Sequence, residues 1–233
     1  MNVAVMQPYI FPYLGYFQLI QSSDKFVFYD DVNFIKKGWI NRNRILLNSK
    51  ENLFTIPLKK VSQNKLINEI ELGIDDKWVK SFFKTLEYAY NKAPYYDKVS
   101  LLVNKVLSSD SRSIADLTIT SILAVCEYLS LDKEFYISSL AFPDTKGLSK
   151  EKRLIEITKK LGSKNYINSA GGVDLYKKTD FKEEGVNLNF IENDLISYKQ
   201  FNAPFINGLS IIDVLMFNSV EETLVLINQY KLN

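Results

Sequence analysis

The 233-residue sequence contains no histidine and a single cysteine, Cys126. Without histidine, the chain can form neither a histidine-dependent catalytic triad nor a His-ligated metal site, and it has no imidazole general base. One cysteine excludes an internal disulfide and a thiolate cluster, and we expect Cys126 to be an inert thiol on a buried helix face. Any chemistry must therefore use carboxylates, lysines, arginines, tyrosines, hydroxyls, amides or a helix N-terminus.

An excess of charge of one sign and long apolar runs are missing as well. Lys and Arg number 29 against 27 Asp and Glu, which leaves a formal charge of +2 and no global field typical of a nucleic-acid or membrane binder. The N-terminal segment has no basic stretch before its apolar run, unlike a signal peptide. No run reaches the ~18 apolar residues of a transmembrane helix. We therefore expect a cytoplasmic protein without membrane insertion.

The apolar periodicity predicts an α/β fold. Short apolar runs at 3–6 and 25–29 flank a helical pattern at 13–20, which suggests a parallel crossover with both strands ending at one edge of a sheet. Further along, we expect two edge strands or a hairpin at 53–58 and 67–72, followed by helices at 75–107 (broken at Pro94) and 113–129. Strands at 135–139, 165–168 and 187–191 then alternate with helices at 150–161 and 175–184. The chain ends in a helical segment at 209–230. These elements predict one α/β domain over 1–233, with a mostly parallel sheet, flanking helices and a helical insertion or cap at about 75–130.

The segment QPYIFPYLGY at residues 7–16 follows the first predicted strand directly. Ligands of open α/β sheets bind where strands end, and a glycine near a helix start allows close backbone approach. We therefore predict five substrate-binding residues here, Gln7, Tyr9, Tyr13, Gly15 and Tyr16. The alternative is that Phe11 and Tyr13 belong to the core and that the prolines only shape the turn.

The segment DDVNFIKKGWINRNR at residues 30–44 carries two of the four arginines of the chain beside two lysines. Arginine at this density suits bidentate contacts with phosphate or carboxylate. We predict an anion-binding stretch made of Lys36, Lys37, Trp39, Asn41, Arg42 and Arg44. Asp30 and Asp31 could accept a proton from an amine or hold Mg²⁺, so these two and Lys36 are the catalytic candidates. The alternative is that the acidic pair only offsets the neighbouring lysines.

Two later segments are candidates for ligand contacts. In DTKGLSKEKR (144–153), Lys146 lies in a turn before a helix for which Ser149 is the expected N-cap; a phosphate contact and a capped helix with solvated lysines are equally good interpretations. In SAGG (169–172), we predict close backbone contact of a ligand with Ser169, Gly171 and Gly172, although the glycines could simply build the turn. For Asp213, which lies amid apolar neighbours, a structural role is favoured.

These motifs resemble the WbqC-like family of bacterial surface-polysaccharide gene clusters. The resemblance rests on MQPYIFPYLGYFQLI (6–20), FVFYDDVNFIKKGWINRNRI (26–45), YNKAPYY (90–96), EKRLIEITKKLGSKNYINSAGG (151–172) and SIID (210–213). It implies transfer of glycine to an amino sugar of a polysaccharide precursor.

A second resemblance is to nucleotidylyltransferase-like α/β domains, including pantothenate synthetase, which joins an acid to an amine through an acyl-adenylate. The strand, proline-bounded loop, glycine and short helix at the start of the chain are similar to the opening of those domains. Gly147, Ser149 and Lys150 are similar to their second phosphate-binding loop. One departure concerns Tyr16, which stands where those enzymes usually have histidine.

Two functions stay open from the sequence. In the first, the chain is an enzyme whose partners are a nucleotide-linked amino sugar and a small amino acid; the donor is either ATP, with Mg²⁺, and free amino acid or an aminoacyl carrier. In the second, it is a non-catalytic nucleotide-sugar binding module of the same pathway. No nucleic acid is expected as a partner, because RNA binding usually needs a broad basic stripe. Metal use and oligomeric state, a homodimer included, are left open.

Overall fold

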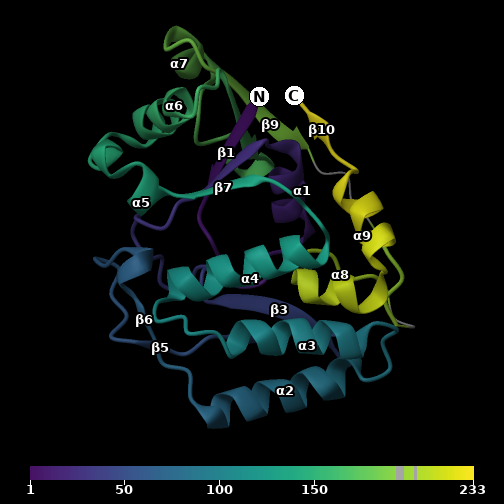
Figure 1. The fold of residues 1–233 in the computed structure, drawn as a ribbon. Coiled ribbons are helices and arrows are strands. Elements are labelled where there is room, and N and C mark those ends of the chain that lie inside the picture. The colour runs from purple at the N-terminus through teal and green to yellow at the C-terminus, as the bar shows by residue number, and fades with distance from the viewer. Residues whose placement is uncertain (193–196, 202–203) are drawn as a thin grey trace.

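The computed structural model describes residues 1–192, 197–201 and 204–233, and these form a central six-stranded sheet (Figure 1). The strands are β1 (Asn2–Met6), β2 (Lys25–Phe28), β7 (Glu134–Ile137), β8 (Asn165–Ser169), β9 (Asn187–Glu192) and β10 (Lys231–Leu232). Their spatial order is β10-β9-β8-β1-β2-β7, and every pairing is parallel except that of β10 with β9. The predicted mostly parallel α/β sheet is therefore confirmed.

The order of the strands defines where a ligand can enter. The chain runs from the central strand β1 outward through β2 to β7, and then crosses to the other side of β1 for β8 and β9. In doubly wound sheets, the loops at the carboxyl ends of the strands diverge where the strand order reverses, and the resulting crevice binds ligands. In this protein the reversal lies between β1 and β8.

Alternating residues of the strands feed two apolar clusters, one on each face of the sheet. Val3 and Val27 belong to the cluster on one face, whereas Ala4 and Phe26 belong to a larger cluster on the opposite face. The covering helices are α6 (Lys150–Lys160) and α7 (Lys178–Glu183) on the first face, and α1 (Leu14–Ser22), α4 (Ile114–Tyr128), α8 (Ile211–Phe217) and α9 (Val220–Ile227) on the second. Side chains that alternate between two covered faces are typical of a buried sheet.

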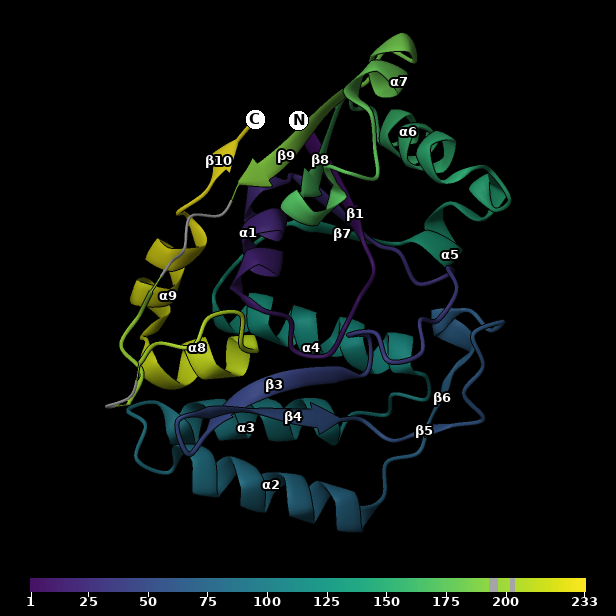
Figure 2. The same ribbon diagram turned by 180° about the vertical axis from the view of Figure 1, so that it is seen from behind.

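A second layer lies below the sheet in the view of Figure 1 and is seen from behind in Figure 2. It consists of the hairpin β3 (Arg42–Leu47) and β4 (Lys50–Thr55), the short strands β5 (Leu58–Lys59) and β6 (Glu71–Leu72), and the helices α2 (Asp76–Tyr90) and α3 (Tyr96–Leu107). The larger apolar cluster continues from the sheet through α4 into this layer. No helix within the described ranges is both long enough and apolar enough to cross a membrane.

The hairpin β3–β4 was not expected from the sequence, where the only strand predicted in this part of the chain was at 53–58. Arg42 and Arg44 lie on a strand that pairs with Thr55 and Leu53, and the turn uses Asn48 and Ser49 with φ of 50° and 60°. Such left-handed residues match the twist of a two-residue hairpin. The expected strand at 53–58 is therefore divided between β4 and β5, and β5 pairs with β6.

The helical end expected at 209–230 also differs from the structure. Helix α8 ends at Phe217, and the backbone is extended at Asn218. Ser219 caps the separate helix α9 by accepting a hydrogen bond from the backbone N–H of Glu222. Serine satisfies an otherwise unpaired N–H at a helix start, and this favours a new helix over a continuous one.

The loop between β1 and α1 is held by side chains from three distant elements. Phe11 is buried and has a φ of 41°. Its carbonyl accepts hydrogen bonds from Asn43 Nδ2 at 2.6 Å and Ser210 Oγ at 2.7 Å, and its N–H donates to Ser121 Oγ at 3.2 Å. A non-glycine residue rarely adopts this conformation unless its surroundings impose it. These contacts therefore hold the shape of the loop.

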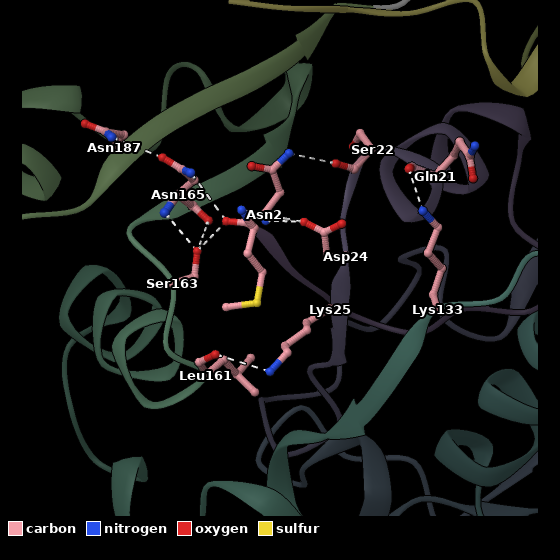
Figure 3. Close-up of polar contacts among 11 residues, drawn as sticks. Asn2, Gln21, Ser22, Asp24, Lys25, Lys133, Leu161, Ser163, Asn165 and Asn187 are labelled. Atoms are coloured by element: carbon pink, nitrogen blue, oxygen red, sulfur yellow. Dashed lines mark hydrogen bonds and ion pairs between the residues drawn. The ribbon is translucent and has the colours of Figure 1, made fainter.

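The amino edge of the sheet is tied together by a polar network (Figure 3). The N–H of Asn2 donates to Asp24 at 2.6 Å, which joins the starts of β1 and β2, and Asn187 Nδ2 donates to Asn165 Oδ1 at 3.1 Å, which joins β9 and β8. Ser163 Oγ donates to the carbonyl of Met1. These contacts hold the amino ends of the strands together.

Candidate functional site

A cleft of ≈ 770 Å³ lies at the carboxyl edge of the sheet, where the strand order reverses. Its walls come from the loops after β1, β2 and β8 and from the segment that leads into α6. Of the predicted site residues, five line it, Gln7, Asp31, Ser169, Gly171 and Gly172. The expectation that the first two strands end at one edge of the sheet is confirmed by the parallel pairing of Met6 with Phe28.

Asp31 forms a buried ion pair with Arg153 in the wall of the cleft. The Asp31 Oδ2 atom lies 2.6 Å from Arg153 Nη2, and the two side chains are only 3% and 5% exposed. The Arg153 Nε atom also donates to Thr145, and its guanidinium lies 4.8 Å from the centre of the Tyr29 ring. Burial is the largest single influence and acts to lower the pKa of Arg153, but the hydrogen bonds and charge interactions with Asp31 and Tyr29 together outweigh burial and raise the pKa. Asp31 and Arg153 therefore fix each other in place.

Asp30 occupies a different position from that of its neighbour. Its Oδ1 atom accepts hydrogen bonds from Ser138 Oγ and the Ser139 N–H, and its Oδ2 atom accepts from Ser139 Oγ and Asn68 Nδ2. These four bonds link the end of β2 to the start of α5 (Ser138–Ala141) and to the 3₁₀ turn Ile67–Glu69. Asp30 is absent from the lining of the main cleft, so geometry favours Asp31 over Asp30 for contact with a ligand.

The two carboxylates do not fit a divalent cation between them. Arg153 already neutralises Asp31, Ser138 Oγ donates to both carboxylates, and the oxygens of Asp30 are occupied by donors. Within the described ranges, no group of three or more acidic or thiol side chains is arranged to hold a metal ion. We therefore assign no step to a metal at these two residues.

The start of α6 presents unpaired backbone N–H groups beside the cleft. Ser149 is the N-cap residue, as expected, but its side chain makes no capping hydrogen bond. Gly147, with a φ of 93°, and Lys150 both line the cleft. A helix N-terminus without a side-chain cap attracts anions through its N–H groups and dipole. This end of the cleft therefore suits a phosphate or carboxylate.

The SAGG turn packs on a buried amide. A Cβ atom placed on Gly172 would lie 2.5 Å from Asn168 Nδ2, whereas one on Gly171 would meet nothing within 4 Å. Asn168 Oδ1 accepts the N–H of Ser169, which fixes the start of the turn. Gly172 is thus required for close packing, while Gly171 leaves the backbone open to the cleft.

A second, smaller hollow of ≈ 240 Å³ collects four other predicted residues, Tyr9, Tyr13, Trp39 and Arg44. Asn43 and Gly208 complete its lining, and we call these six residues the aromatic slot. The aromatic slot has no lining residue in common with the cleft. The predicted binding residues are therefore divided between two places.

The remaining predicted residues lie outside both hollows. Gly15 and Tyr16 are buried, and the hydroxyl of Tyr16 donates to the carbonyl of Gln7. Asn41 Nδ2 and Arg42 Nε donate to backbone carbonyls, Lys36 and Lys37 are exposed on the loop after β2, and Lys146 lines a hollow of ≈ 420 Å³ that also contains Asp31. The catalytic and binding roles of these residues stay predictions.

The prediction omitted several cleft residues. Arg153, Tyr29 and Tyr176 line the cleft. Arg153 is one of only four arginines and lies four residues after Ser149, on the face of α6 that turns toward the sheet. An arginine at a position of apolar helical spacing is a signal of a buried ion pair, and this signal could have identified it.

Asp213 has the structural role that was favoured. It is buried and accepts hydrogen bonds from Tyr90, Tyr198 and Gln200. Burial raises the pKa of Asp213, although these hydrogen bonds act in the opposite direction. The Tyr90 hydroxyl also accepts the N–H of Leu46, so the group joins α8 to α2 and β3.

Comparisons with known proteins identify the family of the chain. The model of the WbqC-like protein family matches residues 7–225. The chain belongs to the WbqC-like family. An uncharacterized protein of Mycobacterium tuberculosis is 26% identical over 220 residues, which cover 93% of each chain. No solved structure matches the chain.

The family match covers both candidate sites. Residues 7–225 include every lining residue of the aromatic slot and all cleft residues except Val5 and Met6. The two hollows are therefore parts of the segment that defines the family.

Proposed function

We propose that this WbqC-like protein forms an amide between glycine, or a similar small amino acid, and the amino group of a nucleotide-linked amino sugar in surface-polysaccharide synthesis in the cytoplasm. The observation that carries the proposal is the cleft at the reversal of the strand order, with an uncapped helix start and Lys150 at one end and the carboxylate of Asp31 in its wall. Its ≈ 770 Å³ falls within the ~300–1,000 Å³ that small-molecule sites occupy.

The start of α6 supports the binding of the diphosphate. Lys150 contributes a full positive charge, and the first N–H groups of an 11-residue helix contribute donors and a dipole. Gly147 has left-handed backbone, and the space next to its Cα is open, because a Cβ placed there would meet nothing within 4 Å. If the diphosphate binds at the start of α6, the rest of the ligand would extend along the cleft toward Asp31 and the SAGG turn.

Asp31 supports the orientation of the sugar amine. A carboxylate has about four lone-pair positions, and the bonds from Ser138 and Arg153 use two of them. An amine or ammonium group can therefore donate to Asp31 without breaking the ion pair. In amide formation, the neutral amine attacks the activated carboxyl carbon, the amine loses a proton and the activating group leaves. Asp31 would position the amine, and Arg153 would hold Asp31 in place.

The test is a reaction with defined components. The protein is incubated with a panel of nucleotide-linked amino sugars, glycine and ATP with Mg²⁺, and mass spectrometry follows the addition of one glycine residue to the sugar nucleotide. A parallel arm replaces ATP and glycine with an aminoacyl carrier. We expect an adduct that requires the protein, and the proposal fails if no donor yields one across the panel.

Variants connect the result to the cleft. Lys150→Ala should weaken binding of the sugar nucleotide, whereas Lys152→Ala, an exposed lysine on the same helix that does not line the cleft, is the matched control. Asp31→Asn should retain binding and lose turnover, provided that a thermal melt shows a folded protein. Saturable binding without turnover in the unmodified protein would instead favour a non-catalytic nucleotide-sugar binding module.

A further inference from the structure

We propose that the aromatic slot binds a neutral sugar ring, at a site separate from the cleft and independent of the function proposed for it. Trp39 is 50% exposed and Tyr13 is 37% exposed, and the loop that leads to Tyr13 is otherwise well packed. Exposed aromatic rings are unusual when they gather beside a hollow. The C–H face of a pyranose is apolar and its rim is polar, which matches rings with a polar edge.

The guanidinium of Arg44 is held rigidly at the base of the aromatic slot. Nη1 lies 2.8 Å from Glu51 Oε2, Nη2 donates to the carbonyl of Gly208 at 2.9 Å, and Cζ lies 5.1 Å from the centre of the Trp39 ring. A Cβ atom at Gly208, where φ is 69°, would approach Arg44 Nη2 to 3.2 Å. Glycine at this position therefore allows the loop to lie against the arginine.

One polar atom of this arrangement lacks a partner. The Nε atom of Arg44 is buried and has no hydrogen-bond partner among the described residues. Such atoms are rare in folded proteins, because a buried donor without an acceptor costs free energy. The Tyr9 hydroxyl already accepts the N–H of Tyr13 and keeps its own proton, since burial raises its pKa. The aromatic slot thus offers donors to a ligand that brings acceptor oxygens.

The charge of the aromatic slot favours a neutral ligand. Glu51 offsets the positive charge of Arg44 through the 2.8 Å ion pair, whereas Lys150 at the cleft forms no ion pair with the residues that the structure describes. A phosphate or carboxylate would have to compete with Glu51 for Arg44. A neutral sugar does not compete for this pair, because its hydroxyls can both donate and accept hydrogen bonds elsewhere in the aromatic slot.

The size of the aromatic slot limits the ligand to about one ring. Its volume is ≈ 240 Å³, and a cavity of ~150 Å³ is enough for benzene. A single six-membered ring with hydroxyl substituents therefore fits, whereas a nucleotide does not. The opening leaves room for a longer saccharide to extend outward.

The aromatic slot lies near the cleft along the chain. Gln7 lines the cleft and Tyr9 lines the aromatic slot, so at most ~7 Å of extended backbone separates their Cα atoms. A second loop makes the same connection, because Ile35 lines the cleft and Trp39 the aromatic slot. A saccharide in the aromatic slot would therefore lie close to the ligand of the cleft.

Saturation-transfer NMR with the methyl glycosides of glucose, galactose and N-acetylglucosamine, and with disaccharides of the same sugars, tests the proposal. We expect saturation of ring protons and a millimolar affinity that falls ~tenfold or more in Trp39→Ala, which corresponds to ~1.4 kcal/mol. Trp78→Phe is the matched control, because Trp78 packs on Phe82 away from the aromatic slot. The exposure of Trp39 makes a folding defect in Trp39→Ala easy to exclude by thermal melting.

Two further arms separate this inference from the proposed function. Lys150→Ala should leave glycoside binding unchanged, because Lys150 lines only the cleft. Uridine and cytidine should bind less tightly than the glycosides. The inference is overturned if no glycoside binds, if Trp39→Ala binds as tightly as the unmodified protein, or if the nucleosides bind more tightly than the sugars, whatever the outcome of the glycine-transfer assay.

Discussion

The buried ion pair between Asp31 and Arg153 leads to a quantitative prediction about stability. Both side chains are almost fully excluded from solvent and the charged atoms lie 2.6 Å apart. Removing one partner of such a pair leaves an uncompensated buried charge, which costs ~3–5 kcal/mol. Arg153→Met and Asp31→Asn should each lower the free energy of unfolding by about this amount.

Urea denaturation followed by circular dichroism measures this loss. With an m-value near ~3 kcal/mol/M, a loss of ~3–5 kcal/mol moves the midpoint by ~1 M or more. Lys105→Met is the surface control, because the pair of Lys105 with Glu127 is 69% and 72% exposed and exposed pairs contribute little.

The double variant Arg153→Met/Asp31→Asn completes the cycle. Because it removes both charges together, its cost should be well below the sum of the two single costs. If each single variant shifts the midpoint no more than Lys105→Met does, or if the two losses simply add, the pair is not buried and coupled as the geometry states.

Three further predictions concern single positions. Gly172→Ala should destabilise the protein by ~1–3 kcal/mol in a thermal or urea melt, because its Cβ would lie 2.5 Å from Asn168, whereas Gly171→Ala should not; equal effects would contradict this packing. Cys126 is 2% exposed and burial raises its pKa to about 12, so a thiol reagent at pH 8 should label it only after unfolding, and rapid labelling of the native protein would refute its burial. Burial raises the pKa of Asp213 above the 3.8 of the unfolded chain, so the stability that protonated Asp213 contributes is present below pH 3.8 and is lost as pH rises through the raised pKa. The loss of unfolding free energy in Asp213→Asn, measured in urea melts, should therefore shrink from about pH 4 to neutrality. A loss that stays constant or grows with pH would contradict this sign.

The sheet was predictable from the sequence because its strands are short apolar runs with clear ends. The runs at 3–6 and 25–29 correspond to β1 and β2, and the helix predicted at 150–161 corresponds to α6. Buried parallel strands are apolar on both faces, so each of them stands out in the sequence as a short continuous apolar run. The meeting of the loops after β1 and β2 followed from the crossover alone.

The division of the binding residues into two hollows was not predictable. Arg42 and Arg44 suggested an anion-binding stretch because Asn48-Ser49 is a weak hairpin signal in the sequence. In a strand, the two arginines lie on one face, and the side chain of Asn43 points to the other face. Asn43 then bonds to the carbonyls of Ile10 and Phe11, across more than 30 residues. Contacts of this sequence separation depend on the whole fold and leave no local pattern.

The contacts of Phe11 imply an order of events during synthesis of the chain. Its partners Asn43, Ser121 and Ser210 lie 32, 110 and 199 residues further along. The ribosome releases the chain from the N-terminus, so the loop emerges early and must wait for Ser210 before its last contact can form. The lining of the cleft ends at Tyr176, whereas the aromatic slot needs Gly208 as well. A chain truncated before residue 208 would therefore lack part of the aromatic slot, and its central loop would lack the contact with Ser210.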